Sequence, residues 1–187
     1  MNLSETQSST RRIVVTAMLC AVAYVVMVAV HLNIVPAAPF LTYDPKDVVI
    51  TIGGFIYGPA EVLIISFIVA FLEMITVSDT GIIGFVMQVI ATLSFSGVAA
   101  VIYRRFHTHK GGFMALFAGT ICMAIIMVLW NLLLSPIYLG TDRATVVAML
   151  VPAIIPFNIL KGVINSVIVL FIYKPVVTSL RRLGFVA

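Results

Sequence analysis

Residues 144–173 read ATVVAMLVPAIIPFNILKGVINSVIVLFIY, an apolar stretch in which Lys161 is the single charged residue. A helix needs about 20 such residues to cross the hydrocarbon core of a bilayer. The same character extends through the whole chain of 187 residues, which is 62% hydrophobic and 10% charged, with a mean hydropathy of +1.20. An ordinary soluble domain is roughly 45–50% apolar and about 25% charged. The composition therefore excludes a water-soluble enzyme or nucleic-acid-binding module and predicts an all-α integral membrane protein.

Five further apolar runs precede this stretch, at residues 13–30, 48–57, 62–77, 82–103 and 113–134. The run 48–57 is short, about 15 Å as a helix, which is half a bilayer. The turn signal Gly58-Pro59 follows it. We therefore predict a separate short helix, beginning near Asp44 and sheltered by its neighbours, rather than the front half of one long helix. The expected architecture is six transmembrane helices in a single domain, residues 1–187.

The basic residues predict how these helices are oriented. Eight of the eleven Lys and Arg residues fall into three clusters: Arg11, Arg12, Arg104, Arg105, Lys110, Lys174, Arg181 and Arg182. The positive-inside rule places all three clusters on the cytoplasmic face, so an even number of helices must separate them. Both termini are therefore expected in the cytoplasm, including the polar tail 1–10. The net charge of +4 needs no nucleic-acid partner, because these clusters orient the helices and meet anionic lipid of the bilayer.

Polar side chains inside membrane spans are costly and are candidates for function. In the last helix Asn158, Lys161 and Asn165 recur every three or four residues and therefore share one face. We expect this face to line a ligand cavity, with Asn158 and Lys161 as hydrogen-bond donors. The alternative is a clamp between helices in which Lys161 pairs with Glu73.

Two amides on other helices are further candidates. A single Asn in a membrane helix usually binds a neighbouring helix. Together with the polar row on the last helix, however, Asn131 favours ligand binding, because an amide offers both a donor and an acceptor. Gln88 on the fourth helix is a weaker candidate.

The segment before the short helix, residues 35–47, is unusually apolar for an aqueous loop. Three prolines stiffen it, and Phe40, Leu41 and Tyr43 cluster within it. We expect this first outer loop to fold over the bundle as a lid on an apolar pocket; the alternative is a rigid connector at the lipid headgroups. On the first helix, Ala17 and Ala21 are four residues apart, a spacing that lets another helix approach closely.

Motifs typical of enzymes are absent from the sequence. The chain has no G-x-x-x-x-G-K-[ST] phosphate loop, no His-Glu metal pair and no Gly-x-Ser-x-Gly elbow. Its two cysteines, Cys20 and Cys122, fall inside apolar runs, so neither a disulfide nor a metal site is expected. We expect a protein without enzymatic activity, metal or cofactor.

Several segments together resemble a known family. Residues 155–162, IPFNILKG, are similar to the sixth-helix signature of riboflavin-specific substrate-binding components of energy-coupling factor (ECF) vitamin transporters. Segments 41–48 (LTYDPKDV), 57–59 (YGP) and 129–131 (LWN) fall where this family has similar segments. The resemblance extends over residues 11–182, and the segment 155–162 is its most specific part.

The resemblance implies a site for riboflavin near the outer face, under the first outer loop. Asn131, Asn158 and Lys161 would bind the isoalloxazine ring, and the ribityl chain would run near residues 42–44. Gln88 stands where the family has a shorter amide. The full set of expected substrate-binding residues is Phe40, Leu41, Thr42, Tyr43, Asp44, Gln88, Asn131, Asn158 and Lys161.

The resemblance also implies partners and a location. Ala17 and Ala21 match the small-residue face that packs on a transmembrane coupling subunit, and two separate ATP-binding subunits would drive the cycle. The protein would be the high-affinity riboflavin-binding subunit of an importer in a prokaryotic cell membrane, releasing the vitamin inside.

Two other functions stay open from the residues. The ligand could be another vitamin, and a cationic one would prefer Glu73, the deep carboxylate. The chain could also be a self-sufficient ion-coupled carrier with Glu73 and Lys161 as its titrating pair. If flavin mononucleotide (FMN) were a ligand, Lys46 or Arg143 at the rim could meet its phosphate.

Overall fold

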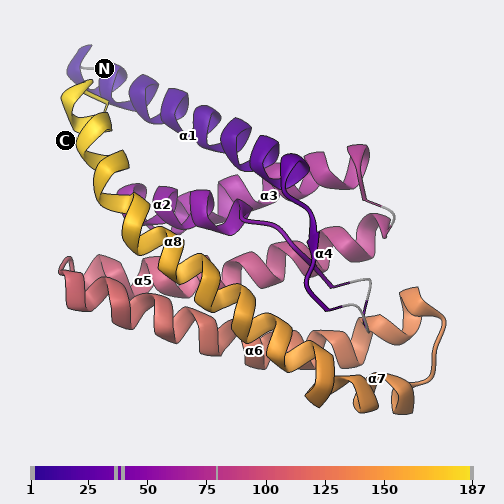
Figure 1. Cartoon of the computed structure of the whole chain (residues 1–187). Coiled ribbons are helices and arrows are strands. Elements are labelled where there is room, and N and C mark those ends of the chain that lie inside the picture. The colour runs from indigo at the N-terminus through magenta and orange to yellow at the C-terminus, as the bar shows by residue number, and fades with distance from the viewer. Residues whose placement is uncertain (1–2, 36–37, 39–40, 79, 186–187) are drawn as a thin grey trace.

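A computed structural model describes residues 3–35, 38, 41–78 and 80–185 of the chain (Figure 1). A two-stranded antiparallel sheet, β1 (Leu32–Asn33) and β2 (Thr42–Tyr43), lies between the first and second helices, with Leu32 opposite Tyr43. The other elements in these ranges are helical: α1 (Leu3–Ala29), α2 (Lys46–Tyr57), α3 (Pro59–Thr76), α4 (Gly81–Thr92), η1 (Leu93–Gly97), α5 (Val98–Arg105), α6 (His109–Leu139), α7 (Arg143–Met149), η2 (Leu150–Ile154) and α8 (Ile155–Arg182).

Two π-helical segments lie inside long helices. The segment η1 joins α4 to α5, and η2 joins α7 to α8, so the predicted runs 82–103 and 144–173 are each one continuous helical rod. Pro152 lies in η2, where its missing N–H and its ring perturb the normal helical hydrogen-bond ladder. The rods keep their length because a π segment widens one turn without ending the helix.

Five helical rods in the described part of the chain are long and apolar enough to cross a membrane: 9–29, 59–76, 81–105, 109–137 and 143–182. Helix α2, with 12 residues, is too short for the roughly 30 Å hydrocarbon core. Most of its residues are buried, because it packs among α1, α3, α5 and α8. The expected shelter for a short second helix is therefore confirmed, whereas its count as a sixth membrane span stays a prediction.

The break between α2 and α3 lies at the predicted turn. Gly58 has φ of 93°, a left-handed conformation that glycine adopts without steric cost. Pro59 occupies the first turn of α3, where its missing N–H removes no helical hydrogen bond. The sequence Gly58-Pro59 thus ends one helix and begins the next.

Both ends of the chain lie at one end of the bundle, together with the α5–α6 turn (Figure 1). The loop between α1 and α2 and the turn between α6 and α7 lie toward the opposite end. This arrangement agrees with the even number of crossings that the basic clusters predict. Which end faces the cytoplasm stays a prediction from the positive-inside rule.

Asp142 begins α7 at the end of the bundle opposite the termini. Its Oδ1 accepts hydrogen bonds from the backbone N–H of Thr145, at 3.1 Å, and from the Thr145 hydroxyl. These bonds favour the charged carboxylate and hold the pKa of Asp142 below its usual value. The residue is an N-cap, a position at which Asp and Asn serve about equally well.

Helix α6 approaches η1 closely at Gly119. A Cβ added at Gly119 would lie 2.5 Å from the backbone oxygen of Phe95, closer than a Cβ atom approaches such a neighbour in folded proteins. Since that oxygen belongs to the backbone of a buried segment, a side chain at position 119 would push the two helices apart.

We expect Gly119→Ala to lower the free energy of unfolding by about 1–3 kcal/mol, the cost of overpacking a core. Gly97→Ala is the matched control, because a Cβ at Gly97 would meet only the Leu93 side chain at 3.8 Å or more. Denaturant titration in detergent measures both changes. Equal stabilities of the two variants would contradict the close packing of α6 on η1.

Candidate functional site

A cavity of about 270 Å³ lies between the first outer loop and α3, α4, α6 and α8. Its volume is near the lower end of the roughly 300–1,000 Å³ range of small-molecule pockets. Six of the nine expected substrate-binding residues line it: Leu41, Thr42, Gln88, Asn131, Asn158 and Lys161. The structure thus brings together residues that are up to 120 positions apart in the sequence.

Two of the expected residues that the structure describes do not line this cavity. Tyr43 is buried behind the wall, where its hydroxyl donates to Asn165 Oδ1 at 3.0 Å. Asp44 is also buried behind the wall, between two lysines. Phe40 lies outside the described residues.

The polar row on α8 faces inward as predicted. Asn158, Lys161 and Asn165 are 2%, 5% and 0% exposed. Asn158 and Lys161 reach the cavity, whereas Asn165 lies deeper and holds the loop through Tyr43. The helical spacing therefore predicted the shared face correctly. Only the packing shows that Asn158 and Lys161 line the cavity while Asn165 holds the loop.

The two amides at the cavity are each fixed by their own helix. Asn158 Nδ2 donates to the carbonyl of Ile154 at 2.8 Å, and Asn131 Nδ2 donates to the carbonyl of Met127 at 2.7 Å. Ser135 donates to Asn131 Oδ1 at 2.8 Å. An amide nitrogen carries two hydrogens, so one N–H on each side chain is left for a further acceptor. Such backbone anchoring restricts both side chains to one orientation.

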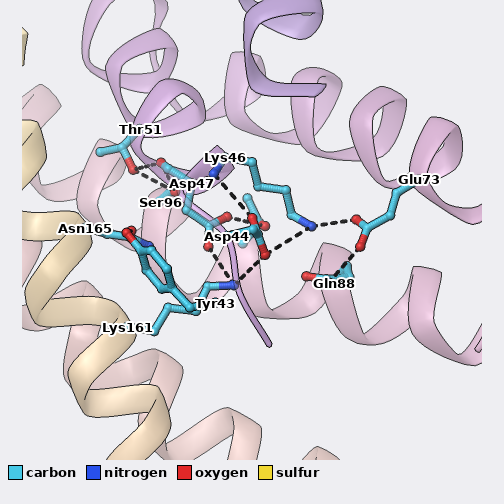
Figure 2. A network of polar contacts seen from close by, with 11 residues as sticks. Tyr43, Asp44, Lys46, Asp47, Thr51, Glu73, Gln88, Ser96, Lys161 and Asn165 are labelled. Carbon is cyan, nitrogen blue, oxygen red and sulfur yellow. Dashed lines mark hydrogen bonds and ion pairs between the residues drawn. The ribbon is translucent and has the colours of Figure 1, made fainter. Parts of the chain in front are cut away.

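Lys161 is held by two carboxylates. Its Nζ lies 3.2 Å from Asp44 Oδ2 and 3.6 Å from Asp47 Oδ2 (Figure 2). Glu73 instead binds Lys46, with 2.5 Å between Oε2 and Nζ. The alternative prediction, a clamp between helices in which Lys161 pairs with Glu73, is therefore wrong. Lys161 pairs instead with Asp44 of the first outer loop and with Asp47 of α2.

These ion pairs belong to a chain of contacts that begins and ends on α4. Gln88 of α4 donates to Glu73 Oε1 at 3.2 Å, and Thr92, one turn further along α4, donates to Asp47 Oδ1 at 2.7 Å. We call this set the charge ring. It consists of Gln88, Glu73, Lys46, Asp44, Lys161, Asp47 and Thr92, joined in that order.

The charge ring is buried and carries an uneven charge. Asp44, Lys46 and Asp47 are at most 1% exposed. Three carboxylates face two ammonium groups, which gives a formal charge of −1. Oδ2 of Asp47 has no hydrogen-bond partner among the described residues, although Lys161 lies 3.6 Å from it. Removing one member of a buried ion pair costs about 3–5 kcal/mol, because the other charge is left uncompensated.

Lys46 and Asp47 are the residues that the sequence analysis missed. Lys46 was expected at the rim, free to meet a phosphate, but it is 1% exposed and bound to Glu73. A signal for this burial exists in the sequence: both residues begin a helix that is too short to span the bilayer. The amino end of such a helix lies below the membrane surface, where a charge requires a partner.

The first outer loop packs on the end of the bundle near the cavity. Its residues Ala38, Leu41 and Tyr43 form an apolar cluster with Val146 and Phe157, among others. Leu41 and Thr42 also line the cavity. The described part of the loop thus covers one side of the cavity, as a lid requires.

Ala17 and Ala21 lie on the outer surface of α1. Both are exposed, whereas Ala23 is buried against α2 and α3. Near the start of the same helix, Arg12 pairs with the buried Glu61 at 2.8 Å, and the Thr16 hydroxyl also donates to Glu61. These contacts fix the rotation of α1, so that the small residues face away from the bundle.

We expect Lys46→Met to lower the free energy of unfolding by about 3–5 kcal/mol, because Glu73 then stays buried without its cation. The double variant Lys46→Met/Glu73→Gln removes both charges and should recover most of this loss. Denaturant titration in detergent measures the two variants. If the double variant were no more stable than Lys46→Met, the loss of stability would not come from an unpaired Glu73 carboxylate.

Comparisons with known proteins place the chain among characterised relatives. The family model described as "ECF transporter, substrate-specific component" matches residues 11–173. The riboflavin transporter RibU of Staphylococcus aureus (strain TCH60) is 28% identical over 180 residues, which cover 92% of this chain and 94% of that protein. The riboflavin transporter FmnP of Bacillus subtilis (strain 168) is 31% identical over 175 residues, covering 87% and 90%.

A solved structure described as the S component of a bacterial ECF transporter has the same fold. It superposes with a TM-score of 0.80 at 28% sequence identity, covering 92% of this chain and 98% of that one. The match thus extends over nearly the full length of both chains.

Proposed function

Because the chain belongs to the family of ECF transporter substrate-specific components, we propose that it is the riboflavin-binding component of an ECF-type vitamin importer. It is a multi-pass protein of the bacterial cell membrane. The observation that carries the proposal is the cavity in which Asn131, Asn158 and Lys161 meet. Two curated relatives that are riboflavin transporters support the choice of vitamin.

The cavity suits one polar edge of a flat, uncharged ring system. The imide edge of riboflavin presents an acceptor, a donor and a second acceptor. Lys161 and the free N–H of Asn158 would donate to the acceptors, and an amide oxygen would accept from the imide. No covalent step is involved, so binding requires only complementary hydrogen bonds and apolar cover.

Apolar side chains supply that cover. Met74, Met87, Met123, Met127 and Phe157 all line the cavity. Methionine is flexible and polarisable, and its sulfur contacts aromatic rings favourably. An isoalloxazine ring would therefore be held between adaptable walls, with its orientation fixed by the polar row on α8.

We further propose that the first outer loop closes over the bound vitamin. Leu41 and Thr42 would contact the ligand directly, because both line the cavity. Tyr43 and Asp44 would act from behind the wall, since Tyr43 anchors the loop to Asn165 and Asp44 binds Lys161. In this arrangement the ribityl chain would run past Thr42.

Delivery requires partners that this chain lacks. We propose that the exposed Ala17 and Ala21 pack on a transmembrane coupling subunit, since small residues let helices approach closely. Two ATP-binding subunits would supply the energy. In this proposal the chain has six spans and cytoplasmic termini, which places the cavity near the extracellular face.

The competing functions are less well supported by the contacts. A cationic vitamin would have to compete with Lys46 for Glu73, the carboxylate expected to bind it, and would meet Lys161 in the cavity wall. An ion-coupled carrier with Glu73 and Lys161 as a titrating pair would need the two to be in contact. Each has a different partner, Lys46 for Glu73 and Asp44 for Lys161.

Asn158→Ala and Lys161→Ala should each weaken riboflavin binding at least about tenfold, as loss of a buried hydrogen bond of about 1–3 kcal/mol implies. Titration of riboflavin fluorescence with the purified protein measures the affinity. Ser166→Ala is the matched control, because it removes a hydrogen bond on α8, from the Ser166 hydroxyl to the carbonyl of Gly162 at 2.6 Å, and does not line the cavity. Unchanged affinity in both cavity variants would reject this site.

Replacing Ala17 and Ala21 with Trp should leave riboflavin binding intact and stop ATP-driven uptake, because the bulky rings block helix approach. The control is Met18→Trp/Val22→Trp, which enlarges two exposed positions of α1 one residue further along the chain. Uptake into cells or vesicles with the complete transporter measures the effect. Equal loss of uptake in both double variants would show that this face is not specific for coupling.

A further inference from the structure

The cavity is bordered by a charge ring with one negative charge in excess. Glu73 and Lys161 belong to both the ring and the cavity wall. Lys161 lies between Asp44 and Asp47, and Lys46 lies between Asp44 and Glu73, so both cations are compensated and one negative charge of the ring is left over. This excess charge repels a negatively charged group of a ligand in the cavity. The repulsion is stronger there than in water, because the surroundings have a low dielectric constant.

The described wall offers no second Lys or Arg to balance this charge, because Lys161 is the one such residue among the described lining residues. His31, an exposed residue before β1, also lines the cavity. Lys46 does not line the cavity; its Nζ lies 2.5 Å from Glu73 Oε2. Arg143 is exposed on α7 and does not line the cavity either.

Glu73 is fixed in this position from two sides. Its Oε2 lies 2.5 Å from Lys46 Nζ, and its Oε1 accepts from Gln88 Nε2 at 3.2 Å (Figure 2). Gln88 also lines the cavity. The carboxylate thus stays in the wall rather than turning away when a ligand enters.

We propose that Glu73 is a specificity-determining residue that makes the cavity select an uncharged flavin over a phosphorylated one. The inference rests on the proposed function and names a further determinant of it. An uncharged ligand is nearly indifferent to the net charge of the ring, whereas a phosphate monoester carries a charge of about −1.5 to −2 at neutral pH and is repelled by it. The ring system is common to both ligands, and the phosphate adds both size and charge; the isosteric change Glu73→Gln tests the contribution of charge.

The test compares the dissociation constants of riboflavin and FMN for the purified full chain. Glu73→Gln brings the ring from a formal charge of −1 to zero. We expect the preference for riboflavin over FMN, expressed as the ratio of the two constants, to fall at least about fivefold in this variant. The ratio is the readout because a general loss of fit affects both ligands alike.

A double variant separates charge from structure. Lys46→Met/Glu73→Gln also removes the ion pair but restores the formal charge of −1, since Asp44, Asp47 and Lys161 are left. We expect its ratio to return to the wild-type value. Glu73→Asp, which keeps the charge, should also keep the wild-type ratio.

Asp142→Asn is the control for charge outside the cavity. It removes one carboxylate near the same end of the bundle, retains the helix cap and does not line the cavity. Its ratio should equal that of the wild type.

Two results would overturn the inference while leaving the proposed function intact. One is an unchanged ratio in Glu73→Gln; the other is the same altered ratio in Glu73→Gln and the double variant, which would assign the effect to the lost ion pair. If the wild-type chain bound no riboflavin, the proposed function itself would fall, and the inference with it.

Discussion

The buried charge ring is the constraint on which the site depends. In a protein made almost entirely of apolar helices, an unpaired charge below the membrane surface is costly. Lys161 on α8 can lie there because Asp44 and Asp47 come to it from the first outer loop and from α2. The same contacts hold the loop against the bundle. One set of ion pairs therefore places Lys161 in the cavity wall and also anchors the segment that covers the cavity.

The ring also explains why the fold tolerates α2, whose 12 residues are fewer than the 27 of α1 and the 18 of α3. Helix α2 begins with Lys46 and Asp47, whose charges would be stable only in water or in contact with partners. The bundle supplies those partners from α3, α4 and α8. Because α2 lies inside the bundle, the two charged residues at its amino end contact Glu73 and Lys161, which line the cavity. The short helix thus supplies two members of the charge ring, Lys46 and Asp47.

Several local features could be predicted because they depend on neighbouring residues along the chain. The helical spacing of Asn158, Lys161 and Asn165 placed them on one buried face, and Gly58-Pro59 marked the break between α2 and α3. The partner of Lys161 could not be predicted in this way. The alternative interpretation named Glu73 as that partner, but Glu73 binds Lys46 instead. The choice among three carboxylates is decided by distances of a few ångströms between separate helices, which spacing along the sequence does not encode.

The sequence by itself determined that this protein is a helical membrane protein, because its hydrophobic content cannot be buried in a soluble fold. It also determined which faces carry polar groups, since helical periodicity is a local property. Only the tertiary structure decided that Asn158 and Lys161 line a cavity while Asn165 anchors the loop. It likewise decided that Lys46 is buried rather than free at the rim. The physical reason is that burial and ion pairing depend on how whole helices pack, and a shift of one helix turn would exchange these partners.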